Sequence, residues 1–245
     1  MVDTLATVLQ YAIYLLEAGV LGYVLLRRRE NSLLPVALYL GLLLSVDGLS
    51  RPFVLYRYGL ASLQYAYFFW LTDVLLALGA FLVVCRFFRR ACAEHRELWQ
   101  VVRLVEVFVL ILVAGVSLFS LSRNFDHLFT RFIVEFQQNL YFTCLVLTTL
   151  LFILMQQLQS ADEELSMLVC GMGVQFAGPA ANLALVYLTP GQVFGSELYR
   201  HIGPFFTLGM LLTWFYALAR VPQPGRAAIT QTVVTELVTT GTGEV

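Results

Sequence analysis

The chain of 245 residues has no lysine, because all 15 of its basic residues are arginines. Proteins that hold a retinal-type chromophore as a Schiff base need a lysine for that bond, so this class of seven-helix protein is excluded. Histidine and cysteine are also scarce, with 3 and 4 residues, and no serine-hydrolase, phosphate-loop or haem-attachment motif occurs. We therefore expect no enzymatic activity, no metal and no cofactor.

Charged residues are also few, at 13% of the chain, whereas soluble domains contain about 25%. Hydrophobic residues make up 59%, the mean hydropathy is +0.78, and the net charge of −1 offers no basic patch for nucleic acid. The composition predicts an all-α, polytopic membrane protein with a seven-helix transmembrane domain over residues 1–220. Each helix corresponds to an apolar block near the length of about 20 residues that spans a bilayer: 4–26, 33–50, 62–88, 98–120, 136–158, 164–188 and 199–220.

The arginines indicate an orientation for this bundle, because short cytoplasmic loops retain positive charge. Nine lie on one side: Arg27, Arg28, Arg29, Arg86, Arg89, Arg90, Arg96, Arg220 and Arg226. Five lie on the other: Arg51, Arg57, Arg123, Arg131 and Arg200. The imbalance favours an external N-terminus and a cytoplasmic C-terminus. Residues 221–245, which are rich in Pro, Gly and Thr, are expected to form a disordered Thr-rich cytoplasmic tail.

Two acidic side chains lie near the middle of predicted helices, Glu17 in 4–26 and Asp73 in 62–88. A charge at the centre of a membrane helix costs about 2.5 to 3.5 kcal/mol, so each requires a physical reason. The first helix also has four polar residues spaced three or four apart, which places them on one face: Thr7, Gln10, Tyr14 and Glu17. We expect this face to point into the bundle.

The helix predicted at 164–188 contains Pro179, which lacks an N–H and should kink the helix. The kink would leave the backbone carbonyl of Gln175 without its usual donor, beside a polar face that also includes Asn182. A second row of small residues would permit close helix packing: Gly173, Ala177, Ala181 and Ala184. The alternative is a packing kink whose free carbonyl is satisfied by a neighbouring hydroxyl or by water.

These polar residues suggest a cavity that opens outward. Its floor would consist of Glu17, Asp73 and Gln175, and its rim of Asp47, Asn139, Asn182 and His201. The candidate ligand-binding residues are Glu17, Asp73, Gln175, Tyr14, Gln10, Asn182, Asp47 and His201. Helix ends are also polar simply because they meet water, so the rim residues have a second explanation. A metal site made of Asp47, Glu17, Asp73 and His201 is disfavoured, because these residues lie at different depths.

The cysteines and one Arg–Glu pair have structural interpretations and are not assigned to a ligand site. Cys92 follows Arg89 and Arg90, a setting in which palmitoylation occurs, but a free thiol is the plainer expectation. No disulfide is expected for any cysteine, because none falls in a predicted external loop. Arg103 and Glu106 are three residues apart on one helix and are expected to neutralise each other as a structural ion pair.

The segment Tyr65-Ala66-Tyr67-Phe68-Phe69-Trp70, followed by Asp73 and by Cys85-Arg86-Phe87-Phe88-Arg89-Arg90, resembles the third helix of an uncharacterised family of seven-helix inner-membrane proteins of soil bacteria. Members of that family often carry Glu where this chain has Asp73. The resemblance covers this segment and the overall layout. It implies a multi-pass protein of the bacterial cytoplasmic membrane and no known activity.

The predicted function is the binding of a small ligand or lipid by a sensor that signals through partners. Membrane lipids and proteins at the cytoplasmic face or within the bilayer are the expected partners, and nucleic acid is not. A structural subunit of a larger membrane complex is the first alternative. A small-molecule or ion transporter is the second, and it is disfavoured because only the helix at 164–188 is interrupted, whereas carriers use paired broken helices.

Overall fold

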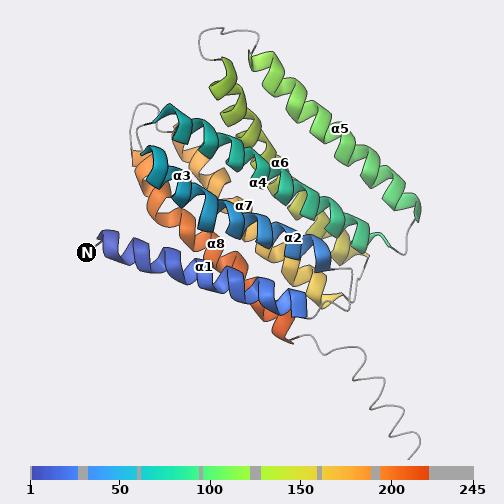
Figure 1. Ribbon diagram of the computed structural model, residues 1–245. Helices are drawn as coiled ribbons and strands as arrows, with labels where there is room; N and C mark the ends of the chain where they lie inside the picture. The colour runs from blue at the N-terminus through green and yellow to red at the C-terminus, as the bar shows by residue number, and fades with distance from the viewer. Residues whose placement is uncertain are drawn as a thin grey trace, which may run out of the picture.

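The computed structural model describes the backbone of residues 2–26, 33–59, 62–93, 96–121, 128–158, 162–188 and 194–220, and the side chains of these residues except 2–7, 96, 116–121, 128–134, 182–188 and 194–202. The predicted tail, 221–245, lies outside the described residues. The described part is all-α, as predicted, and contains seven helical rods and no strand. Figure 1 shows them as α1 (Val2–Leu26), a composite rod of α2 (Leu34–Leu43), the π-helical η2 (Leu44–Ser50) and α3 (Arg51–Tyr58), then α4 (Leu63–Ala91), α5 (Arg96–Leu121), α6 (Leu128–Gln157), α7 (Glu163–Leu188) and α8 (Phe194–Arg220).

Several of these rods have the length and composition of membrane spans. Within the described residues, five stretches are long and apolar enough to cross a bilayer: Val8–Leu26, Leu34–Tyr58, Leu63–Ala91, Glu97–Gly115 and Glu135–Gln157. Their exposed surfaces carry many large hydrophobic side chains, among them Leu15, Leu38, Leu82 and Phe108. Such surfaces suit contact with hydrocarbon, so the chain has the features of a multi-pass membrane protein.

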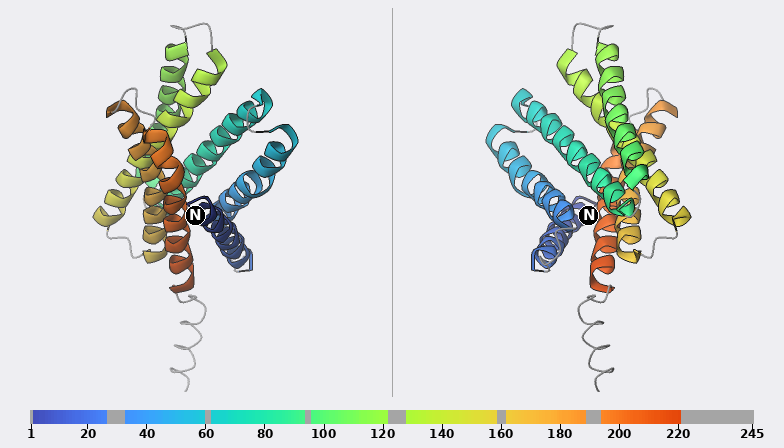
Figure 2. Two further views of the ribbon diagram at one scale, coloured as in Figure 1. Left: turned by 90° about the vertical axis from the view of Figure 1, so that its left-hand side faces the viewer. Right: turned by 90° about the vertical axis from the view of Figure 1, so that its right-hand side faces the viewer.

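Six of the rods form a closed ring. Going round it, α1 packs against α2, α2 against α4, α4 against α6, α6 against α7, α7 against α8, and α8 against α1. Helix α5 is not part of the ring; it packs mainly on the outside of α6 and lies at the edge of the molecule in Figure 1. Figure 2 shows α1 to α4 on one side and α6 to α8 on the other. The interior of the ring is therefore enclosed by helices from both halves of the chain.

Among the described helices, α7 and α8 pack most extensively on each other, and glycines leave room there for aromatic rings. A Cβ added at Gly171 would lie 2.6 Å from the Trp214 ring, and one at Gly178 would lie 2.7 Å from Phe206. The indole Nε1 of the fully buried Trp214 donates to the carbonyl of Leu168 at 2.9 Å. The row of small residues that begins at Gly173 was predicted to permit close packing. A Cβ at Gly173 would meet only Thr148 of α6, at 3.7 Å, so the approach there is looser than at Gly171 or Gly178.

The predicted inner end of the ring is held by Arg90, near the end of α4. Its Nε and Nη2 donate to the two carboxylate oxygens of Asp162 at 2.8 and 3.1 Å, and its Nη1 reaches Glu164 at 3.3 Å. Asp162 also caps α7, because its Oδ1 accepts the N–H of Leu165 at 3.0 Å. This two-point contact of an arginine with a carboxylate fixes the end of α4 to the start of α7.

On the inner side, the free thiol expected at Cys92 is confirmed, whereas the ion pair expected between Arg103 and Glu106 is not formed. Cys92 is only 1% exposed, and this burial raises the pKa of its thiol, with the nearby charge of Glu106 acting in the same direction. A buried thiol of this kind is a poor target for palmitoylation, and all four cysteines are free. Arg103 and Glu106 do not pair: Arg103 is exposed on α5, whereas Glu106 is buried and interacts with Cys85 of α4.

Candidate ligand-binding cavity

A cavity of about 370 Å³ lies inside the helix ring. Its walls contain residues from all six ring members, and none of the lining residues in the described part of the chain comes from α5. The lining residues are Gln10, Ile13, Tyr14, Glu17, Tyr39, Leu43, Asp47, Arg51, Phe69, Asp73, Leu76, Gln137, Gln138, Tyr141, Gln175, Pro179, Gly203, Pro204 and Thr207. A volume in this range fits the lower part of the span of about 300 to 1,000 Å³ that small-molecule sites occupy.

The structure brings together six of the eight candidate residues around this one cavity: Gln10, Tyr14, Glu17, Asp47, Asp73 and Gln175. The other two, Asn182 and His201, lie in α7 and α8, and their side chains are outside the described ones. Glu17 is nine residues before the end of α1 and Asp73 ten residues after the start of α4, so both lie about 14 to 15 Å from those helix ends.

The second predicted helix was placed too short. It does not stop at residue 50 but continues to Tyr58, with a π-helical stretch from Leu44 to Ser50. Arg51 is therefore not in an outer turn, and Asp47 is not on a rim at a helix end; both are inside the rod and line the cavity. The sequence Arg51-Pro52 has the composition of a helix stop, but proline is tolerated here at the start of α3.

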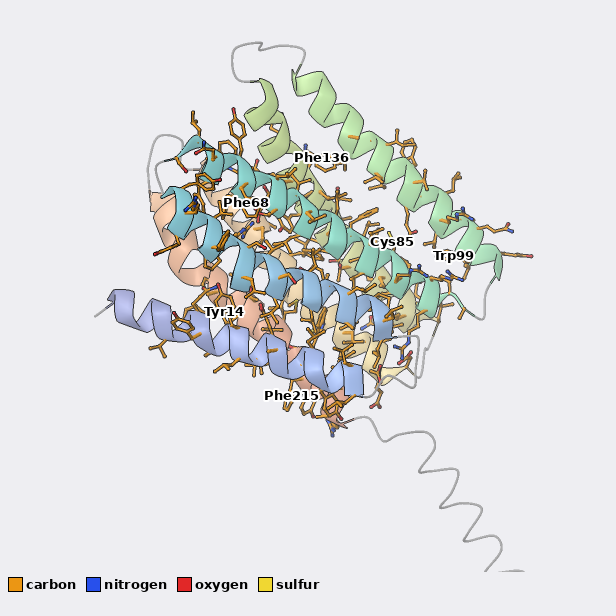
Figure 3. The ribbon with its side chains drawn as sticks, viewed as in Figure 1. Tyr14, Phe68, Cys85, Trp99, Phe136 and Phe215 are labelled. Atoms are coloured by element: carbon orange, nitrogen blue, oxygen red, sulfur yellow. The ribbon has the colours of Figure 1, made fainter. Side chains whose placement is uncertain are left out.

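The π-helical stretch also explains a contact with α1. The N–H of Arg51 donates to the carbonyl of Val46, five residues back, and not to that of Asp47 as it would in an α-helix. The carbonyl of Asp47 instead accepts the hydroxyl of Tyr14 at 2.8 Å, and Gln10 donates to the same hydroxyl at 2.8 Å. Figure 3 labels Tyr14 on α1. The irregular backbone thus joins the polar face of α1 to the second rod.

Arg51 is the central residue of this network. Its Nη1 lies 2.6 Å from Asp47 Oδ1 and its Nη2 2.8 Å from Asp73 Oδ1, while its Nε donates to Thr72 at 3.2 Å. The guanidinium also sits 4.2 Å from the centre of the Phe69 ring, which adds a cation–π contact. Asp73 lines the cavity, where it was expected to form part of the floor, and it is paired with Arg51 and also accepts a hydrogen bond from Gln137 of α6.

Two buried acceptors at the cavity are left without donors among the described residues. They are Oε2 of Glu17, a side chain only 1% exposed, and the side-chain oxygen Oε1 of Gln175. Buried polar atoms are nearly always hydrogen-bonded, and an orphan costs about 1 to 3 kcal/mol. The cavity also has three carboxyl groups, Glu17, Asp47 and Asp73, with one guanidinium among the described lining residues. Arg51 serves both aspartates, so Glu17 is the acid without a cation.

More helices are irregular at this cavity than the sequence indicated. Pro179 lies inside α7, as expected, but Pro204 also lies in the interior of α8, because that helix begins at Phe194 and not near residue 199. Both prolines line the cavity. Together with the π-helical stretch, they place irregular features of three helices around one site, whereas the sequence indicated one; the backbones of α7 and α8 are helical through both prolines.

Four residues important to the cavity were missed as site residues: Arg51, Gln137, Tyr141 and Pro204. Arg51 was assigned to a turn, although an Asp four residues earlier is a signal for a same-helix pair. Gln137 and Tyr141 are four apart on α6, which is the same spacing that identified the face of α1. Among the described residues, no three His, Cys, Asp or Glu side chains are arranged to hold a metal ion.

Comparison with protein-family models, with curated proteins and with solved structures finds no match to this chain. The site must therefore be interpreted from its own geometry.

Proposed function

We propose that this protein binds a small polar ligand in the cavity of the six-helix ring and acts as a membrane sensor that signals through partners. One observation carries the proposal: Glu17 and Gln175 present buried acceptors, without donors among the described residues, to a cavity of about 370 Å³. A ligand that donates hydrogen bonds would satisfy both acceptors. The cavity is lined by all six ring members, so a bound ligand would affect the packing of the whole ring.

The proposed location is the bacterial cytoplasmic membrane, with seven spans, an external N-terminus and a cytoplasmic C-terminus. Five described spans and the uneven arginines support it. Arg51 lines the cavity inside the second rod, so it does not count against this orientation. Signals would leave through the arginine-rich inner turns or the tail, to partners at the cytoplasmic face or within the bilayer.

Native mass spectrometry of the protein extracted gently from its own membrane tests the binding proposal. We expect a small-molecule adduct on the wild-type protein that is lost with Glu17→Gln. The matched control is Glu106→Gln, which changes another buried acid outside the ring and should retain the adduct. Release of further protein subunits with an empty cavity would contradict the proposal and favour a structural subunit of a larger complex.

Transport is the second candidate, and the irregular helices favour it. Carriers build sites near the middle of the membrane from interrupted helices, and here η2, Pro179 and Pro204 meet at one cavity. Reconstitution into liposomes separates the two functions. A carrier moves the adduct molecule across the bilayer and loses this with Glu17→Gln, whereas a sensor binds it and leaves the internal concentration unchanged.

A further inference from the structure

We propose that the ligand of the cavity is a protonated amine that carries at least one N–H, held by the carboxylate of Glu17. This inference rests on the proposed function, because it names the chemical class that the ring cavity accepts. It follows from the groups that the cavity leaves unsatisfied, from the chemistry of the part that is satisfied, and from the aromatic rings in the wall.

The unsatisfied groups define the polarity of the ligand. Both Glu17 Oε2 and Gln175 Oε1 are acceptors, so a ligand that satisfies them must donate. An anion would add like charge to Glu17, Asp47 and Asp73, and a ligand with only acceptors would leave both oxygens unsatisfied. A neutral donor would satisfy the oxygens but would bring no charge to balance the carboxylate form of Glu17, and a buried acid without a cation takes up a proton instead. A cation with N–H groups meets both needs.

Arg51 shows the same chemistry within the protein. Its nitrogen cation is held by two carboxylates, at 2.6 and 2.8 Å, and by the face of Phe69 at 4.2 Å. The other part of the cavity has a carboxylate, Glu17, and an amide, Gln175, but no cation of its own among the described lining residues. One half of the site is thus filled by an internal guanidinium, and the other half is suited to an external ammonium.

The aromatic lining fits such a ligand. Tyr14, Tyr39 and Tyr141 lie in the cavity wall in addition to Phe69. Tyrosine faces attract ammonium groups, with a gain that grows when the cation is removed from water. The cavity is a poorer site for a metal ion, because among the described residues no three acidic, His or Cys side chains come together as ligands. The wall therefore favours an organic cation over a bare metal ion.

The amine could be a free molecule or the headgroup of an aminolipid, since both present the same –NH₃⁺ group. The protein is reconstituted in nanodiscs of phosphatidylglycerol, which has no amine, and its thermal unfolding is followed with methylammonium, ethanolamine, putrescine and agmatine. Nanodiscs of phosphatidylethanolamine form a parallel arm. If stabilisation by free amines disappears there, because the headgroup already fills the site, the source is the lipid; if it persists, the source is a free amine.

We expect at least one of the four amines to stabilise the wild-type protein, and tetramethylammonium, a cation without N–H, to bind at least about tenfold more weakly. Glu17→Gln should weaken amine binding by about 10- to 100-fold, which is the worth of a hydrogen bond to a charged group. Glu106→Gln should leave amine binding unchanged, which would show that the loss is specific to Glu17 and does not follow from removing another buried acid.

Three results would overturn the amine assignment: no amine stabilises the wild-type protein, tetramethylammonium binds as well as the primary amines, or Glu17→Gln binds them with unaltered affinity. These results are separable from failure of the proposed function itself. If native mass spectrometry shows an adduct that is neutral or anionic, the cavity still binds a ligand, and only the assignment of that ligand as an amine is refuted.

Discussion

Replacing Arg51 by Gln tests whether the ion-pair centre holds the ring together. The change leaves Asp47 and Asp73 as two acids without their shared cation, in side chains that are only 26% and 20% exposed. Removing one partner of a buried pair costs about 3 to 5 kcal/mol. Because these acids are partly exposed, we expect the lower end, about 3 kcal/mol, which is about 100-fold in the folding equilibrium.

The assay is reversible unfolding in detergent by titration with sodium dodecyl sulfate, followed by tryptophan fluorescence, to which the buried Trp214 contributes. Arg103→Gln is the matched control, since Arg103 is exposed on α5 and lies outside the cavity, and it should unfold like the wild-type protein. The triple change Asp47→Asn, Arg51→Gln, Asp73→Asn removes the charges together and should recover most of the loss.

Two results would refute this reasoning. If Arg51→Gln unfolds at the same detergent fraction as the wild-type protein, the contacts at 2.6 and 2.8 Å do not contribute to stability. If the triple variant is as unstable as the single one, the loss comes from the volume and shape of the Arg51 side chain and not from the two acids left without a cation.

Two further predictions concern the packing of α7 on α8 and the thiol at the end of α4. Gly171→Ala should destabilise the protein by about 1 to 3 kcal/mol, because its Cβ would meet Trp214 at 2.6 Å, whereas Gly173→Ala should unfold within about 0.5 kcal/mol of wild type. Cys92 should resist a water-soluble maleimide at pH 8, because burial raises its pKa and lowers its thiolate fraction; Ala93→Cys in a Cys92→Ser background should react readily, and equal rates would contradict this.

The helices could be predicted from sequence because apolar blocks and membrane spans share one length. Helix bounds were less well predicted, for example in the second rod, where Arg51-Pro52 has the composition of a stop. Charge and proline normally end a helix, but here the charge is neutralised by Asp47 within the rod and by Asp73 from another helix. The second of these partners is 22 residues away, and local patterns do not reveal a contact of that kind.

The polar face of α1 could also be predicted, since a spacing of three and four residues places Gln10, Tyr14 and Glu17 together. Which of the acids has a cation could not be predicted from their depth alone. Asp73 and Glu17 both lie inside spans, yet only Asp73 faces Arg51. The partner depends on which helices are neighbours in the ring, and the order of that ring is a property of the fold.

The π-helical stretch gives the site an unusual dependence on chain length. A π-turn amounts to one residue inserted into an α-helix, and the wider turn absorbs that residue, so the segments on either side keep their facing. Deleting one residue other than Asp47 between Leu44 and Ser50 would return the rod to α-helical hydrogen bonding, in which each N–H bonds to the carbonyl four residues back. The Asp47 carbonyl would then be satisfied within the rod and would no longer accept the hydroxyl of Tyr14. The loss of one codon would therefore break this link between α1 and the second rod while the spans stay long enough to cross the membrane.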